Sequence, residues 1–115
     1  RFGGRMAGWF ELNKNEKGQY SFVLNAGNSE IILRSETYES KSSAENGIAS
    51  VQKNSGDDAR YSKETAKDGR LYFNLKAANH QVIGTSQMYK SEDSRATGMA
   101  SVKTNGSTKT IKDLT

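Results

Sequence analysis

The chain contains few residues that carry acid–base, nucleophilic or metal chemistry. It has one histidine, His80, and no cysteine. Thiolate nucleophiles, disulfides and Cys-based zinc sites are therefore excluded, and one imidazole is too few for most transition-metal sites. His80 has the chemistry of an acid, a base or a phosphate contact. Because a 51-residue repeat, described below, places Ser29 at the equivalent position, a solvated turn histidine is the favoured interpretation.

Four more side chains are candidate contacts for a ligand or nucleic acid: Asn79, Lys76, Arg70 and Trp9. Asn79 precedes His80 in a turn, where Asn ordinarily tolerates a positive φ or bonds its own backbone. Trp9 has no counterpart in the second repeat and is interpreted as either a stacking platform or an edge residue. The sequence shows neither a phosphate-binding Gly-x-x-x-x-Gly-Lys-Ser/Thr loop nor a Gly-x-Ser-x-Gly elbow. No catalytic, cofactor-binding or metal-ligating residue is predicted, and no cofactor is expected.

Positive charge is concentrated in the second half of the chain. Residues 62–115 carry nine basic and five acidic side chains, whereas residues 6–61 carry six and eight. Sheets that bind single strands combine stacking rings with basic surroundings, and Tyr20, Phe22, Tyr72 and Phe73 fall on expected strands. Phe22 and Phe73 are also needed for a core, and no RNP-like string is present. Nucleic-acid binding is therefore kept as the alternative hypothesis.

An internal repeat defines the architecture. A shift of 51 residues superimposes Gly18 on Gly69 and continues without a gap to Asn54 on Asn105. The recurring residues of the first copy are Gly18, Phe22, Leu24, Ala26, Asn28, Ile32, Ser35, Tyr38, Ser40, Ser43, Gly47, Ala49, Ser50, Val51 and Asn54. Each copy alone would bury little, so the two are expected to share one sheet and one core.

Hydrophobic periodicity predicts three strands and then a helix in each copy. The first copy gives strands at 9–13, 20–24 and 30–37, and the third strand recurs at 81–88. Ser42 with Glu45 has the pattern of a capping box, and Asp93 is the expected cap of the second helix. Gly47 and Gly98 recur inside the helices, where glycine costs about 1 kcal/mol relative to Ala, which predicts that each helix approaches the sheet closely there. Residues 109–112 are expected to form a last short strand.

Several segments resemble the YegP-like family of small bacterial proteins in its tandem-repeat form. They are Met6-Ala7-Gly8-Trp9-Phe10-Glu11-Leu12, Phe22-Val23-Leu24, Tyr38-x-Ser40-Lys41-x-Ser43-Ala44-Glu45-x-Gly47-Ile48 and Phe73-Asn74-Leu75-Lys76-Ala77-Ala78-Asn79-His80-Gln81. The resemblance implies an α+β fold in which two tandem β3-α-β repeats form a single mostly antiparallel sheet packed by two helices, with last strands swapped between repeats. It implies no biochemical activity.

The sequence therefore predicts a small protein of unknown biochemical activity. Residues 1–5 are interpreted as a vector-derived remnant or a disordered N-terminus, and residues 6–115 as one domain of two repeats, about 8–58 and 59–115. The favoured function is a non-enzymatic binding module for an unidentified protein or ligand. Weak binding of single-stranded nucleic acid through the basic second repeat is the alternative, and an enzyme that uses His80 is the least favoured. A cytoplasmic monomer without membrane contact is expected.

Overall fold

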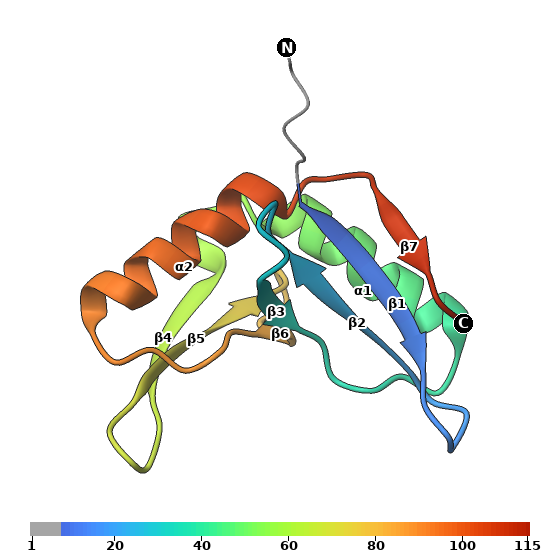
Figure 1. Ribbon diagram of the computed structural model, residues 1–115, viewed down its shortest axis with the longest axis horizontal. Helices are drawn as coiled ribbons and strands as arrows, with labels where there is room; N and C mark the ends of the chain where they lie inside the picture. The colour runs from blue at the N-terminus through green and yellow to red at the C-terminus, as the bar shows by residue number, and fades with distance from the viewer. Residues whose placement is uncertain (1–7) are drawn as a thin grey trace.

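A computed structural model describes residues 8–115 as one seven-stranded sheet with two helices (Figure 1). The strand order is β4-β5-β6-β3-β2-β1-β7. The strands are β1 (Trp9–Lys14), β2 (Tyr20–Asn25), β3 (Ile31–Arg34), β4 (Tyr61–Thr65), β5 (Leu71–Lys76), β6 (Val82–Thr85) and β7 (Ile111–Asp113). Every neighbouring pair is antiparallel except β1 with β7, which confirms the predicted fold class. Residues 1–5, interpreted above as a remnant, lie outside the described residues.

The last strand crosses from the second repeat to the first. β7 lies parallel to β1, and the Phe10 N–H donates to the carbonyl of Thr110 at 2.9 Å. After the first helix, by contrast, the chain passes through a 3₁₀ turn, η1 (Asp58–Arg60), directly into β4. β4 is therefore both the strand that follows the first helix and the first strand of the second repeat.

The two repeats meet at a pair of central strands related by the repeat itself. β3 pairs with β6 through Arg34 and Thr85, which occupy equivalent positions under the 51-residue shift. A quasi-twofold axis therefore passes between these two residues. Leu33 and Gly84 are also equivalent, and a Cβ on Gly84 would lie 2.6 Å from two carbons of Leu33. One large and one absent side chain thus share the space beside the axis.

The helices are α1 (Lys41–Asn54) and α2 (Glu92–Asn105), and their caps differ from the prediction. The expected caps, Ser42 and Asp93, lie inside the helices. Ser40 and Ser91 cap them instead, because each adopts an extended backbone and its Oγ accepts the N–H three residues on at 3.1 Å.

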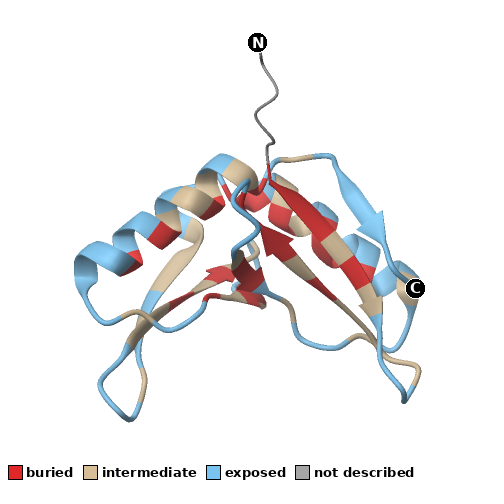
Figure 2. Cartoon of the chain, viewed as in Figure 1, coloured by how far each residue is buried: buried red, intermediate tan, exposed pale blue. Residues whose placement is uncertain are grey.

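Both helices pack on strands of both repeats, which gives one shared core. α1 contacts β2, β5 and β6, and α2 contacts β5, β2 and β3. Figure 2 shows buried residues along the strands and along the sheet-facing side of the helices. The fully buried side chains include Phe10, Phe22, Phe73, Leu24 and Leu75. The core prediction from strand alternation is therefore confirmed.

The third strand of each repeat is shorter than predicted, because a serine side chain interrupts the backbone pairing. β3 ends at Arg34, and the Oγ of Ser35 accepts the Phe22 N–H at 2.9 Å. Pairing resumes only as an isolated bridge between Tyr20 and Tyr38. Ser86 does the same for Phe73. The predicted last strand is displaced as well, from 109–112 to 111–113.

The helix glycines lie against tyrosine rings, as the predicted close approach requires. A Cβ on Gly47 would lie 2.6 Å from the Tyr38 hydroxyl oxygen, and a Cβ on Gly98 would overlap the hydroxyl of Tyr89. Tyr38 stacks on Phe22 and Tyr89 on Phe73, each with ring centroids 6.3 Å apart. The glycines therefore make room for a tyrosine that is held against the core.

Candidate functional site

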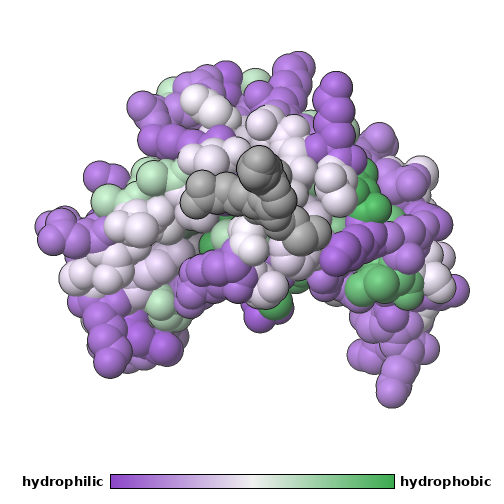
Figure 3. All heavy atoms as spheres, turned by 45° about the horizontal axis from the view of Figure 1, so that its top comes forward, coloured by the Kyte–Doolittle hydropathy of each residue, from purple (hydrophilic) through white to green (hydrophobic). Residues whose placement is uncertain are grey.

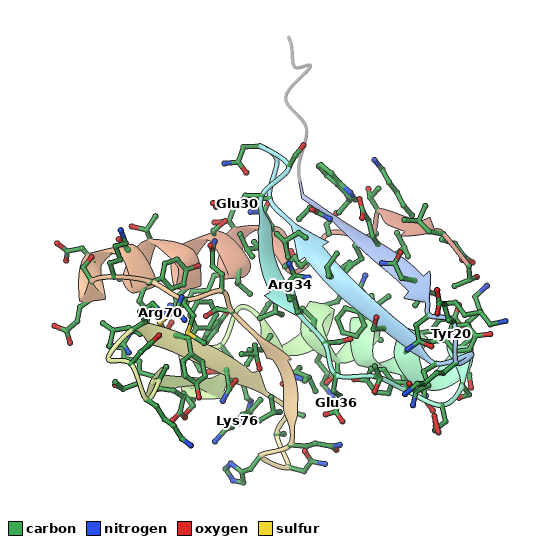
Figure 4. The ribbon with its side chains drawn as sticks, turned by 60° about the horizontal axis from the view of Figure 1, so that its bottom comes forward. Tyr20, Glu30, Arg34, Glu36, Arg70 and Lys76 are labelled. Atoms are coloured by element: carbon green, nitrogen blue, oxygen red, sulfur yellow. The ribbon has the colours of Figure 1, made fainter. Side chains whose placement is uncertain are left out.

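The structure does not bring the five sequence-predicted contact residues together. Asn79 and His80 lie exposed in the β5–β6 turn, and Lys76 ends β5 beside them. Arg70 precedes the opposite end of β5, and Trp9 lies in β1, in the other half of the sheet. Figure 4 shows Arg70 and Lys76 at separate places on the second repeat.

The local contacts of Asn79 and His80 are those of an ordinary turn. The Asn79 side chain accepts the Gln81 N–H at 3.0 Å, and His80 has a φ of 69°. Ser29, its equivalent in the β2–β3 turn, has a φ of 71°. The repeat therefore preserves a left-handed turn position rather than an imidazole.

Arg70 and Trp9 are both engaged within the protein. Arg70 Nε lies 2.7 Å from Asp68 Oδ2, and the backbone N–H and guanidinium of Arg70 hold the pKa of Asp68 below its usual value. Trp9 is only 6% exposed, its Nε1 donates to Glu11, and Lys112 Nζ lies 4.5 Å from its ring centroid. Trp9 is therefore a covered side chain and not an open stacking platform.

The aromatic rings that motivated the nucleic-acid hypothesis are mostly inside the protein. Phe22 and Phe73 are 1% and 0% exposed, and Tyr20 packs against the core. Among the basic residues, Arg95 is buried beside Glu92. These contacts remove part of the support for the nucleic-acid hypothesis, which stays a prediction.

Among the described residues, a pocket of about 410 Å³ lies between the β2–β3 turn and α2, and it is here called the α2 pocket. The first repeat contributes Asn28 and Glu30 from the turn, with Ala26 and Ile32 beside them. The second repeat contributes Gln87 and Tyr89 before the helix, and Ser94, Thr97, Gly98 and Ser101 from α2 itself. The pocket exists only because the two repeats share one sheet.

Local structure fixes both walls of the α2 pocket. On the turn side, the Ala26 N–H donates to the Glu30 carbonyl at 2.8 Å, and Asn28 Oδ1 accepts the Glu30 N–H at 3.0 Å. On the helix side, Ser94, Thr97 and Ser101 follow one another at spacings that place them on one face of a helix. Hydroxyl and amide groups therefore line the opening, with Gly98 between them.

The electrostatics of the α2 pocket come from one carboxylate, that of Glu30. The lining residues that the structure describes include no Lys or Arg. Burial raises the pKa of Tyr89, and the charge of Glu30 raises it further, whereas the nearby Gln87 side chain lowers it. The Tyr89 hydroxyl nevertheless has no hydrogen-bond partner among the described residues. The pocket thus offers hydroxyl and carboxamide groups and one negative charge.

The part of the chain that the structure describes has neither a metal-binding cluster nor a membrane-spanning helix. Within residues 8–115, the His, Asp and Glu side chains form no group of three that could hold a metal ion. Neither helix in that range has the length and apolar character needed to cross a membrane. The cytoplasmic location stays a prediction.

Sequence reasoning missed the pocket although it found most of its walls. Asn28, Tyr89, Ser94, Gly98 and Ser101 all belong to the recurring set. Their sequence positions do not show that the turn of one repeat faces the helix of the other. Glu30, Gln87 and Thr97 gave no signal, because they differ between the copies.

The sheet, the two-repeat topology and the pocket shared between repeats define a tandem-repeat α+β protein. The family model described as "Domain of unknown function (DUF1508)" matches residues 15–62 and again 66–113. The chain belongs to this family, with two copies of its domain, as the YegP-like resemblance predicted.

Relatives of known sequence and structure extend over nearly the whole chain. The UPF0339 protein ACIAD0721 of Acinetobacter baylyi is 67% identical over 96% of this chain and 99% of its own length. The UPF0339 protein YegP of Escherichia coli is 63% identical over 96% of this chain and 100% of its own length. The solution NMR structure of the E. coli protein, described as of unknown function, has a TM-score of 0.90 at 62% identity and covers 97% of each chain. That of the Shewanella oneidensis UPF0339 protein SO3888 has a TM-score of 0.89 at 61% identity, covering 95% of this chain and 92% of that one. The relatives support the fold and assign no activity.

Proposed function

We propose that this chain is a non-enzymatic binding module whose α2 pocket holds a small organic amine. The observation that carries the proposal is the composition of the pocket, in which hydroxyl and carboxamide groups surround a single carboxylate. A volume of about 410 Å³ lies within the range of small-molecule sites, roughly 300–1,000 Å³.

The charge of the pocket selects the class of ligand. An ammonium group has three donors and no acceptor, so it matches the Glu30 carboxylate and the oxygens of Asn28, Gln87 and the α2 hydroxyls. Phosphates and carboxylates would meet the negative charge of Glu30 without a lining cation. The opposite arrangement, with anions favoured, needs Lys or Arg in the wall.

The non-enzymatic part of the proposal rests on the position of the titratable groups. The single histidine of the sequence, His80, is in the β5–β6 turn, whereas the α2 pocket is built from the β2–β3 turn and α2. Glu30 is thus the one charged residue among the lining residues described, and the imidazole that most often serves as a general base is not among them.

A titration followed by ¹⁵N NMR tests the proposal with ethanolamine, putrescine, glucose and inorganic phosphate as probes. Ethanolamine and putrescine should shift the amides of Asn28, Thr97 and Gly98, and Glu30→Gln should weaken their binding about two- to fivefold, the range expected of an exposed ion pair. Glu16→Gln, in the β1–β2 turn at the other end of β2, is the matched control and should leave binding unchanged. Amides that do not respond to either amine would refute the proposal.

We also propose that the module acts as a monomer. β7 completes the sheet against β1 within the same chain, so strand exchange between chains is not needed to cover that edge. On the face that Figure 3 shows, the surface outside the grey residues is mostly hydrophilic, and apolar residues form small separate patches. Light scattering should give the mass of one chain, and a mass of two chains would contradict this proposal.

A further inference from the structure

The residues that build the α2 pocket have counterparts in the other half of the molecule. Under the 51-residue shift, Asn28, Tyr89, Ser94, Gly98 and Ser101 recur as Asn79, Tyr38, Ser43, Gly47 and Ser50. The counterparts come from the β5–β6 turn of the second repeat and from α1 with its preceding segment. At the α2 pocket the first repeat supplies the turn and the second supplies the helix, whereas on the other side the second repeat supplies the turn and the first supplies the helix.

The walls on the α1 side are built by the same contacts. α1 contacts β5 and β6 as α2 contacts β2 and β3. Gly47 faces Tyr38, which stacks on Phe22 at 10°, as Gly98 faces Tyr89, which stacks on Phe73 at 8°. In the β5–β6 turn, the Ala77 N–H donates to the Gln81 carbonyl at 2.9 Å, which repeats the bond that closes the β2–β3 turn.

Each half of the molecule has one glutamate at a pair of equivalent positions, but the glutamate occupies a different position in each half. Glu30 corresponds to Gln81, and Gln87 corresponds to Glu36. At these two positions each side therefore has one carboxylate and one carboxamide, with the carboxylate on the turn in one case and before the helix in the other. Figure 4 shows Glu30 at the β2–β3 turn and Glu36 on the segment that leads to α1.

Folding does not account for this exchange. Among the hydrogen bonds and ion pairs of residues 8–115, the side chains of Glu30, Gln81, Glu36 and Gln87 take no part, and all four residues are exposed. The recurring Asn and Ser residues, by contrast, bond their own turns and helices. Glu36 nevertheless lies close enough to Tyr38 to act on it, since burial raises the pKa of Tyr38 and the charge of Glu36 raises it further.

We propose that the surface formed by Ser43, Asn46 and Gly47 of α1, the β5–β6 turn and Glu36 is a second site for the same class of small organic amine. This inference rests on the proposed function of the α2 pocket. Glu36 takes the role of Glu30 from the opposite wall, so the ammonium group is held at the other end of the site. The chain then binds two amine molecules at separate sites.

A titration with ethanolamine tests this, because the two helices supply separate ¹⁵N amide reporters. The amides of Thr97 and Gly98 report on the α2 pocket, and those of Asn46 and Gly47 report on the α1 site. Both sets should move and saturate. Glu36→Gln should weaken the response of the α1 set alone, about two- to fivefold, and Glu30→Gln should weaken that of the α2 set alone.

A rescue variant tests whether the α2 pocket needs its carboxylate at position 30 or only one carboxylate anywhere in its wall. Gln87→Glu combined with Glu30→Gln copies the α1 arrangement into the α2 pocket, and it should restore ethanolamine binding there to within about twofold of wild type. Glu16→Gln again serves as the control.

The outcomes distinguish this inference from the proposed function. If the α2 amides respond and the α1 amides do not, the second site is refuted and the α2 pocket stands. If neither set responds, the proposed function itself fails. If Glu36→Gln weakens the response of both sets equally, the independence of the two sites is refuted.

Discussion

Gly84→Ala is the substitution for which the structure makes the sharpest stability prediction. A Cβ at this position would lie 2.6 Å from the Cγ and from the Cδ2 of Leu33, its equivalent across the quasi-twofold axis. Carbon atoms pack at about 3.5–4.0 Å, so the overlap is about 1 Å. Leu33 is 1% exposed, which prevents it from turning into solvent.

The expected cost is the difference of two terms. Overpacking a filled core costs about 1–3 kcal/mol, and replacing glycine recovers about 0.4–1 kcal/mol by restricting the unfolded chain. At the middle of each range, Gly84→Ala should therefore lower the free energy of unfolding by about 1.3 kcal/mol. Urea unfolding followed by the fluorescence of Trp9 measures this change.

Two further variants make the reasoning refutable. Gly56→Ala is the matched control, because a Cβ there has nothing within 4 Å, and its effect should stay within about 0.5 kcal/mol. Leu33→Ala alone should cost about 2–5 kcal/mol. In that background Gly84→Ala should no longer destabilise, which gives a coupling energy of about 1–2 kcal/mol. Penalties that add within about 0.3 kcal/mol would show that the two side chains do not compete for one space.

Three other predictions concern single contacts. The Lys41 ammonium lies 2.6 Å from the Asp113 carboxylate and lowers its pKa to about 2, and hydrogen bonds from Thr115 add to this effect. The pair therefore stabilises β7 fully above pH 3.8, and this stabilisation is lost as the pH falls toward 2. Lys41→Met should move the Asp113 pKa toward 3.8 in an NMR titration, and an unchanged value would contradict the assignment. His80→Val places a β-branched residue at a φ of 69° and should lower the thermal midpoint by an amount equivalent to about 1–2 kcal/mol, whereas equal stability would show that the turn relaxes freely. Tyr61→Phe removes the hydroxyl that donates to the Ser55 carbonyl at 2.6 Å and should cost about 0.5–1.5 kcal/mol in urea unfolding; no loss would mean that water replaces this bond.

The repeat in the sequence predicted the fold because strand alternation and helix periodicity report on burial at each position. Phe22, Leu24, Phe73 and Leu75 were thus placed correctly in the core. The caps were misplaced because Ser40, Ser42 and Ser43 are chemically similar, and only the backbone conformation distinguishes the residue that begins the helix.

The candidate site was not predicted, because it depends on how the repeats are placed against each other. Asn79, His80 and Lys76 are near one another in the sequence and remain together, but Trp9 and Arg70 were grouped with them by residue type alone. The α2 pocket joins residues 26–32 to residues 87–101. No local pattern encodes that approach.

The two repeats differ in sequence at two kinds of position: at the quasi-twofold axis, where identical side chains would overlap, and at exposed positions, where packing sets no requirement. At the axis, two leucines at positions 33 and 84 would compete for one space, so one copy has glycine and packing dictates the asymmetry. At the pocket, Glu30 and Gln81 face solvent, as do Gln87 and Glu36, and packing dictates nothing there. The two proposed sites each use one carboxylate from these exposed positions, on the turn in one half and before the helix in the other. Glu30→Gln with Gln87→Glu is therefore the most informative variant of the pocket, because it moves the carboxylate without changing the number of charges.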